Sequence, residues 1–254
     1  EVAGAGGVIA GTALAGPLVG LGGYEAAGWA SIAIGVLATA LPMALPASRP
    51  ATSVEDDEVG PDGYLATLRA GVIEAGRQGP VRRAVVTVAA LTGITAVEEY
   101  VPLLTAGMEL ASATVPLVLL FPAIAVAIGA ELSGRLGGIS PRRVAALVAV
   151  GAALVAVGAL VRHPAGLAVV AVGYGAITCC SLIAGARLQD AITGPRATVT
   201  SVAGFGTEVV ALAIFAGAGS GSGLVATPGL VAATMLPLLA FAVLVPRWLP
   251  AARA

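Results

Sequence analysis

Residues 144–161 read VAALVAVGAALVAVGALV, an apolar run bounded by Arg143 on one side and by Arg162 on the other. The run contains no polar side chain. An α-helix rises ~1.5 Å per residue, so about 20 apolar residues cross the ~30 Å hydrocarbon core of a bilayer. This stretch therefore predicts a transmembrane α-helix.

The rest of the chain has the same character. Of its 254 residues, 58% are hydrophobic and 11% are charged, and the mean hydropathy is +0.98. Such a composition is typical of an integral membrane protein and not of a soluble domain. We therefore expect an all-α, polytopic membrane protein with about eight transmembrane helices, the other seven at 2–23, 28–45, 84–105, 112–132, 166–188, 198–218 and 227–245.

The one long polar region, residues 46–83, predicts a division into two helices (1–45), a cytoplasmic linker (46–83) and a six-helix bundle (84–254). Within the linker, the acidic run from Glu55 to Glu58 has two interpretations, a solvated spacer or a docking site for a partner. The stretch 62–78 predicts an amphipathic helix along the membrane surface, with these side chains on roughly one face: Tyr64, Leu65, Leu68, Val72 and Ile73.

All thirteen basic residues are arginine, and their distribution predicts the orientation of the chain. Cytoplasmic loops collect positive charge. The connectors on the opposite side hold only Arg162, so we expect both termini in the cytoplasm. The other twelve lie in every second connector or after the last helix: Arg49, Arg69, Arg77, Arg82, Arg83, Arg135, Arg142, Arg143, Arg187, Arg196, Arg247 and Arg253.

Several classes of function find no support in the sequence. The net charge of −1 and the aromatic content of 4% argue against a nucleic-acid partner. Cys179 and Cys180 lie in an apolar run and His163 in a short connector, so we expect no metal site and no cofactor. No hydrolytic or nucleotide-binding motif occurs, and we therefore do not expect an enzyme.

Three carboxylates inside predicted helices are candidate functional groups. Ionisable groups in hydrocarbon cost from ~3 to over 10 kcal/mol and usually face a cavity. Glu208 lies ~15 Å into its helix, near mid-bilayer. Glu98 and Glu99 lie ~20 Å along theirs and point ~100° apart, so at most one faces a given cavity squarely. The alternatives are that Glu98 lies at the lipid interface and that Glu208 only bonds to a neighbouring hydroxyl.

The first apolar helix carries a stripe of small residues. It reads GTALAGPLVGLGG from Gly11 to Gly23, with Gly16 and Gly20 on one face and Pro17 between them. Small faces allow helices to pack closely, and plain packing is one interpretation. The glycine-proline pair followed by glycine also resembles the fifth helix of proton-coupled antiporters in the major facilitator superfamily.

Three further segments resemble the same family, in the family's own order. The loop ELSGRLGGISPRRV (131–144) is similar to its cytoplasmic-loop motif, EEYVPLL (98–104) to a seventh-helix segment, and RLQDAITGPRATVTSVAGFGTEV (187–209) to an eleventh helix with its preceding loop. The loop residues that match are Leu132, Arg135, Gly137, Arg142 and Arg143.

The resemblance covers nearly the whole chain, as helices five to twelve of a twelve-helix member. It implies a secondary active transporter that exports small lipophilic molecules in exchange for protons by alternating access, with the bilayer, the substrate and protons as partners. Glu208 and one of Glu98 or Glu99 would carry protons, and the secondary pathway candidates are Tyr100, Tyr174 and Thr178. The alternative is a membrane assembly or regulatory subunit that does not transport.

Overall fold

The computed structural model describes residues 2–40, 61–112 and 114–252, and in this part of the chain every regular element is a helix. Six helical stretches are long and apolar enough to cross a membrane. The fold class is therefore confirmed as an all-α membrane protein, whereas the count of eight transmembrane helices stays a prediction. The helices are α1 (Val2–Ala40), α2 (Pro61–Arg77), α3 (Gly79–Gly93), η2 (Ile94–Tyr100), α4 (Val101–Ala106), α5 (Val115–Arg135), α6 (Pro141–Leu160), α7 (Pro164–Ala191), α8 (Arg196–Gly221), α9 (Thr227–Ala242) and α10 (Val245–Trp248).

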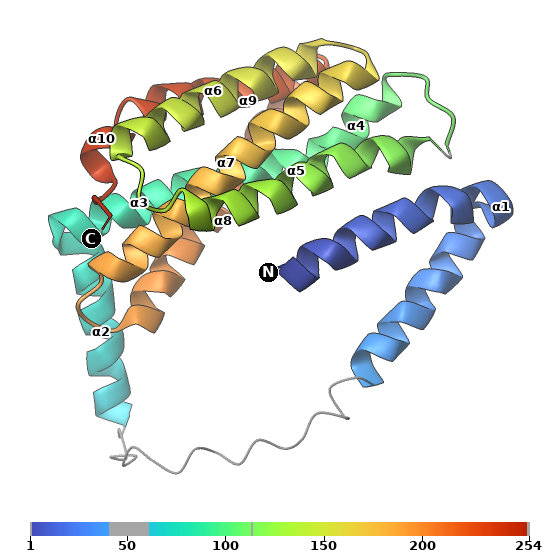
Figure 1. The fold of residues 1–254 in the computed structure, drawn as a ribbon. Coiled ribbons are helices and arrows are strands. Elements are labelled where there is room, and N and C mark those ends of the chain that lie inside the picture. The colour runs from blue at the N-terminus through green and yellow to red at the C-terminus, as the bar shows by residue number, and fades with distance from the viewer. Residues whose placement is uncertain (1, 41–60, 113, 253–254) are drawn as a thin grey trace.

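The two apolar segments expected at 2–23 and 28–45 form one broken helix, α1. The break lies at Gly23, whose φ of 67° and ψ of −168° are non-helical and accessible essentially only to glycine. Pro17 lies inside the first arm, and the helix continues through it. The first arm packs on α5, while residues 31–40 of the second arm are exposed and diverge from the bundle (Figure 1). Residues 41–45 of the predicted helix lie outside the described part.

The expected linker is partly helical. Residues 46–60, including the acidic run, lie outside the described part, and α2 then spans most of the predicted amphipathic stretch. The helix presents Gly71, Glu74 and Ala75 to the bundle, and leaves Leu68, Val72 and Ile73 of the expected apolar face exposed. In Figure 1, α2 leaves α3 at a steep angle. Helix α3 begins five residues before the expected boundary at residue 84.

The bundle is organised around α7. Its apolar stretch is the most buried of the six, at 61%, and α7 contacts α3, α5 and α6. Glycines permit this close approach, because a Cβ atom at Gly175 would lie 2.6 Å from the carbonyl oxygen of Ala125 on α5, and one at Gly173 would lie 2.5 Å from that of Gly151 on α6. Small residues are the usual means by which membrane helices pack closely.

The apolar exterior of the bundle is what a bilayer requires. Helices α5 and α8 bury only 17% of their apolar stretches. Large side chains such as Phe205 and Leu212 are 71% and 65% exposed. A water-soluble protein rarely exposes apolar surface on this scale, so the surface supports a membrane protein independently of the composition.

Local signals begin two of the central helices. Ser140 caps α6 and Pro141 occupies its first turn, where the missing N–H costs nothing. At α7, His163 Nδ1 accepts a hydrogen bond from the backbone N–H of Ala165 at 3.1 Å, and Pro164 follows. The sole histidine is therefore a capping residue in a turn.

Candidate functional site

The membrane-spanning stretch Gly79–Ala106 is not one continuous α-helix. Between α3 and α4 it tightens into η2, a 3₁₀-helix of seven residues. Pro102 contributes to this break because it lacks an N–H and its ring clashes with the carbonyl four residues earlier. Runs of 3₁₀-helix this long are uncommon and often mark a functional hinge. Both Glu98 and Glu99 lie on this irregular backbone.

Just before η2, the segment is pressed against α8. A Cβ atom at Gly93 would lie 2.8 Å from the carbonyl oxygen of Thr207 and 2.5 Å from Cβ of Val210. Near the other end of η2, the ring of Tyr100 packs on Phe215 of α8 with centroids 6.1 Å apart. Contacts with α8 therefore hold the break on both sides.

Tyr174 of α7 reaches this break. Its side chain is 3% exposed. The hydroxyl lies 2.7 Å from the backbone carbonyl oxygen of Thr95 and 2.9 Å from Oε2 of Glu98. The structure thus joins two residues that the sequence had nominated separately, 76 positions apart.

Glu98 and Glu99 both line an open cavity of ≈ 270 Å³ between α1, α5 and the η2–α4 segment. The two carboxylates, Thr12 of α1 and apolar walls make a site suited to a small molecule with an apolar body and a polar or cationic group. The remaining lining residues are Val101, Pro102, Leu119, Pro122 and Ala123. Both carboxylates border the cavity, although adjacent residues of a 3₁₀-helix point ~120° apart, so the expectation that at most one of them faces it squarely stays a prediction.

Glu208 lies apart from this cavity. Its neighbours Thr207 and Val210 face Gly93, whereas Glu208 is exposed on α8, on the same side as Phe205 and Leu212. The structure therefore brings Glu98, Glu99 and Tyr174 together and leaves Glu208 on another surface.

The secondary candidates have other surroundings. The backbone carbonyl of Thr178 accepts a hydrogen bond from Ser181 Oγ at 2.9 Å, and the Thr178 side chain is half-buried. Cys179 and Cys180 are buried free thiols. Gly16 is buried, while Pro17 and Gly20 are exposed, so only Gly16 of the antiporter-type motif is packed.

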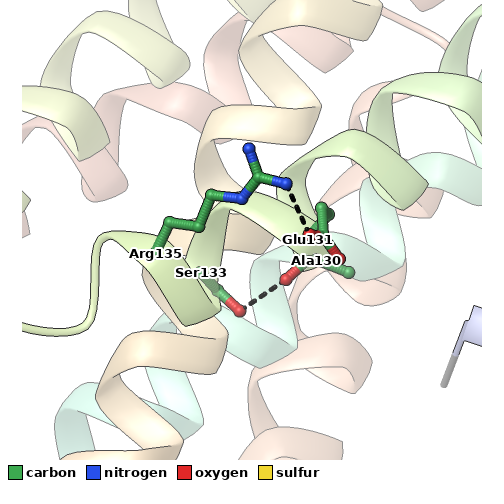
Figure 2. Close-up of polar contacts among 4 residues, drawn as sticks. All are labelled: Ala130, Glu131, Ser133 and Arg135. Carbon is green, nitrogen blue, oxygen red and sulfur yellow. Dashed lines mark hydrogen bonds and ion pairs between the residues drawn. The ribbon is translucent and has the colours of Figure 1, made fainter.

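The predicted cytoplasmic-loop residues lie in and around the loop between α5 and α6: Gly137 in the loop, Leu132 and Arg135 at the end of α5, and Arg142 and Arg143 at the start of α6. Figure 2 shows Arg135 at the end of α5 reaching back to Glu131, with Nη2 and Oε1 3.0 Å apart. Both side chains are more than half exposed, and such a pair contributes about 0.2–1 kcal/mol. Leu132, Arg142 and Arg143 are exposed.

Arg187 is a structural residue that the sequence analysis missed beyond its effect on topology. It is 2% exposed at the end of α7. Its Nη1 donates to the carbonyl of Pro250 at 3.1 Å, and its Nη2 donates to the carbonyls of Gly137, at 3.0 Å, and Ile139. The α5–α6 loop, the end of α7 and the C-terminal segment therefore meet at one end of the bundle. An arginine inside the last turns of an apolar helix was the available signal.

Glu74 on α2 is a second missed residue. It is 4% exposed. Its Oε1 accepts hydrogen bonds from Thr193 N at 2.8 Å, Thr193 Oγ1 at 3.0 Å and Gly194 N at 3.2 Å. The bond from the Thr193 N–H, more than the other two, lowers the pKa of Glu74 below its ordinary value, against the opposing effect of burial. Glu74 thus fastens the linker helix to the loop between α7 and α8.

Comparison with protein-family models, with curated proteins and with solved structures finds no match to this chain. The cavity and its carboxylates therefore have to be interpreted from their own geometry.

Proposed function

We propose that this chain is the transporting part of a secondary active transporter that exports small lipophilic molecules in exchange for protons. The observation that carries the proposal is the pair Glu98 and Glu99 in an apolar-walled cavity, on a broken transmembrane segment. Broken helices at membrane depth are tolerated only where they are covered by protein or line a cavity, and they are common at transporter binding sites.

Glu98 is the better candidate for the proton carrier. It faces the cavity, from which a proton can arrive, and it contacts the hydroxyl of Tyr174, which can stabilise either protonation state. Glu99 shares the cavity, and its side chain makes no hydrogen bond within the described part of the chain, so it is placed to attract a cationic group of the substrate. Glu208 remains a second candidate carrier on a separate surface.

The division of the fold supports alternating access. Helices α3 to α9 form one packed bundle, whereas α1 contacts it mainly through α5. Movement of the α1 side relative to the bundle would open and close the cavity at the α1–α5 contact. With the arginine-rich end of the bundle in the cytoplasm, both termini lie inside the cell.

A flux assay tests the proposal. The chain is reconstituted in proteoliposomes, and efflux of a lipophilic cationic dye is followed with and without an imposed pH gradient. We expect gradient-driven flux that Glu98→Gln removes and that the matched exchange Glu131→Gln, at the exposed ion pair, leaves unchanged. Flux that ignores both the pH gradient and Glu98→Gln would reject the proton-coupled mechanism.

A non-transporting assembly or regulatory subunit is the second candidate. The observation in its favour is the second arm of α1, where Trp29 is 68% exposed and Ile34 is 60% exposed. Such a helix can pack against another membrane protein. Native mass spectrometry of the chain extracted from its own membrane distinguishes the two: a stoichiometric partner chain together with an absence of flux favours the subunit.

A further inference from the structure

The Tyr174 hydroxyl has one proton and two acceptors. The carbonyl oxygen of Thr95, at 2.7 Å, and Oε2 of Glu98, at 2.9 Å, are both within hydrogen-bond distance. A carbonyl oxygen can only accept, and so can an ionised carboxylate. When Glu98 is ionised, the hydroxyl can therefore satisfy one of the two with a linear bond, not both.

Protonation of Glu98 removes this conflict. A protonated carboxyl group donates its own hydrogen to the Tyr174 oxygen, and the Tyr174 hydrogen is then free for the Thr95 carbonyl. No covalent bond of Tyr174 changes, because its hydroxyl only rotates. When the proton leaves Glu98 for the cavity, the stronger charge-assisted bond draws the Tyr174 hydrogen to the carboxylate, and the Thr95 carbonyl loses this donor.

The charged groups near Tyr174 indicate that its hydrogen bond switches with the protonation of Glu98. Glu99 is the adjacent charge on η2. Three charged helices pack on η2: α8 carries Arg196 and Glu208, α3 carries Arg82 and Arg83, and α7 carries Arg187 and Asp190. The residues of α1 and α5 that line the cavity are uncharged, and α4 and α9 contain no charged residue. Among the described groups, Tyr174 is the one whose hydroxyl touches both the carboxylate and the backbone of the broken segment.

We infer that Tyr174 is a positioning residue that relays the protonation state of Glu98 to the backbone of η2. In the protonated state Tyr174 bonds to the η2 backbone at Thr95, whereas in the ionised state the Thr95 carbonyl loses this bond and Tyr174 holds η2 through the Glu98 side chain alone. The inference deepens the proposed function and rests on it for the role of Glu98 as proton carrier. Protonation of Glu98 would in this way change the hydrogen bonding of the η2 backbone, where the membrane-spanning helix is already irregular.

Carbon-13 NMR of tyrosine tests the relay without a transport assay. The full chain in lipid nanodiscs is labelled at the ring carbon that bears the hydroxyl, whose shift reports whether the group donates or accepts. The chain has four tyrosines, and Tyr174→Phe identifies the signal of interest. We expect the Tyr174 signal to move in one step as the pH rises from acidic to mildly alkaline.

Two near-isosteric variants assign that step. Glu98→Gln should abolish it and hold the signal at its low-pH position, because the amide NH₂ donates as the protonated carboxyl group does. Glu99→Gln should retain a step, and an unchanged Tyr100 signal verifies that the break is still packed on α8. A wild-type signal that does not move with pH overturns the inference whatever the variants do, as does a step that persists in well-folded Glu98→Gln.

The NMR result and the flux result separate the two proposals. A pH-dependent Tyr174 signal in a chain whose flux ignores the pH gradient supports the relay and rejects proton-coupled export. Proton-driven flux together with a constant Tyr174 signal rejects the relay and leaves the proposed function in place.

Discussion

Glu74 gives the sharpest quantitative prediction of the fold. One carboxylate oxygen accepts three hydrogen bonds from the loop between α7 and α8. Hydrogen bonds to a charged group contribute about 1.5–3 kcal/mol each, but bonds to a shared oxygen are not additive. Glu74→Gln keeps the size of the side chain and removes its charge, and we expect it to weaken the docking of α2 by about 2 kcal/mol, which is roughly a thirtyfold change in the local opening equilibrium.

Hydrogen exchange followed by mass spectrometry measures that opening directly. The donors are the backbone N–H groups of Thr193 and Gly194. Peptides covering these amides should exchange faster in Glu74→Gln by about the factor given above, while peptides from the centre of α7 stay protected. Glu131→Gln, which neutralises an exposed carboxylate, is the matched control and should leave both unchanged. Equal exchange at residues 193 and 194 in wild type and Glu74→Gln would refute the docking role.

The same contact has a defined pH dependence. Docking lowers the pKa of Glu74 from its ordinary value of 4.5, so the docked state binds fewer protons than the undocked state near that pH. The contribution of Glu74 is therefore complete above pH 4.5 and is lost as the pH falls through the lowered value. Protection of the two amides should decline on acidification in the wild type, and the decline should be absent in Glu74→Gln.

Three further substitutions test the packing by thermal unfolding or proteolysis. Gly129→Ala would place a Cβ atom against the backbone of α7 and should destabilise the bundle by about 1–3 kcal/mol. The control Gly134→Ala, on the same helix, places its Cβ atom in open space and should be neutral or stabilising. Equal melting temperatures of the two variants would contradict the close packing of α5 on α7. Gly23→Ala should cost about 1–3 kcal/mol, since the backbone there has a φ of 67°, and an unchanged melting temperature would contradict the break in α1. Arg187→Gln should expose the C-terminal segment to carboxypeptidase, while Arg142→Gln, at an exposed position, should not; equal rates would remove the anchoring role.

The boundaries of the long helices were largely accessible from the sequence. The run 144–161 starts three residues after the start of α6 and ends one residue after its end, because charged residues flank the run and Ser140 caps the start of the helix. The break at η2 was not accessible. Residues 84–105 are apolar on both sides of it, and the irregular turn combines the local effect of Pro102 with the non-local approach of Gly93 to α8.

The sequence could predict individual residues of the candidate site but not how they lie relative to one another. Intramembrane carboxylates can be identified individually because they are costly in hydrocarbon. Hydropathy does not specify partners, however, so the contact between Glu98 and Tyr174 required the fold. The same reason explains Glu74, which the sequence did not single out, and Arg187, which it used only to predict topology. Their partners are backbone groups of loops far along the chain.

Arg187 recognises its neighbours by their carbonyl groups alone. Every residue type supplies a carbonyl, so the side chains at positions 137, 139 and 250 are not part of the recognition and can drift in sequence while the contact persists. The guanidinium itself is not exchangeable in this way, because the single ammonium group of lysine cannot present a planar fork to three separate oxygens. The single side chain of Arg187 thus joins α7, the α5–α6 loop and the C-terminal segment, and the contact does not restrict which side chains its partners carry.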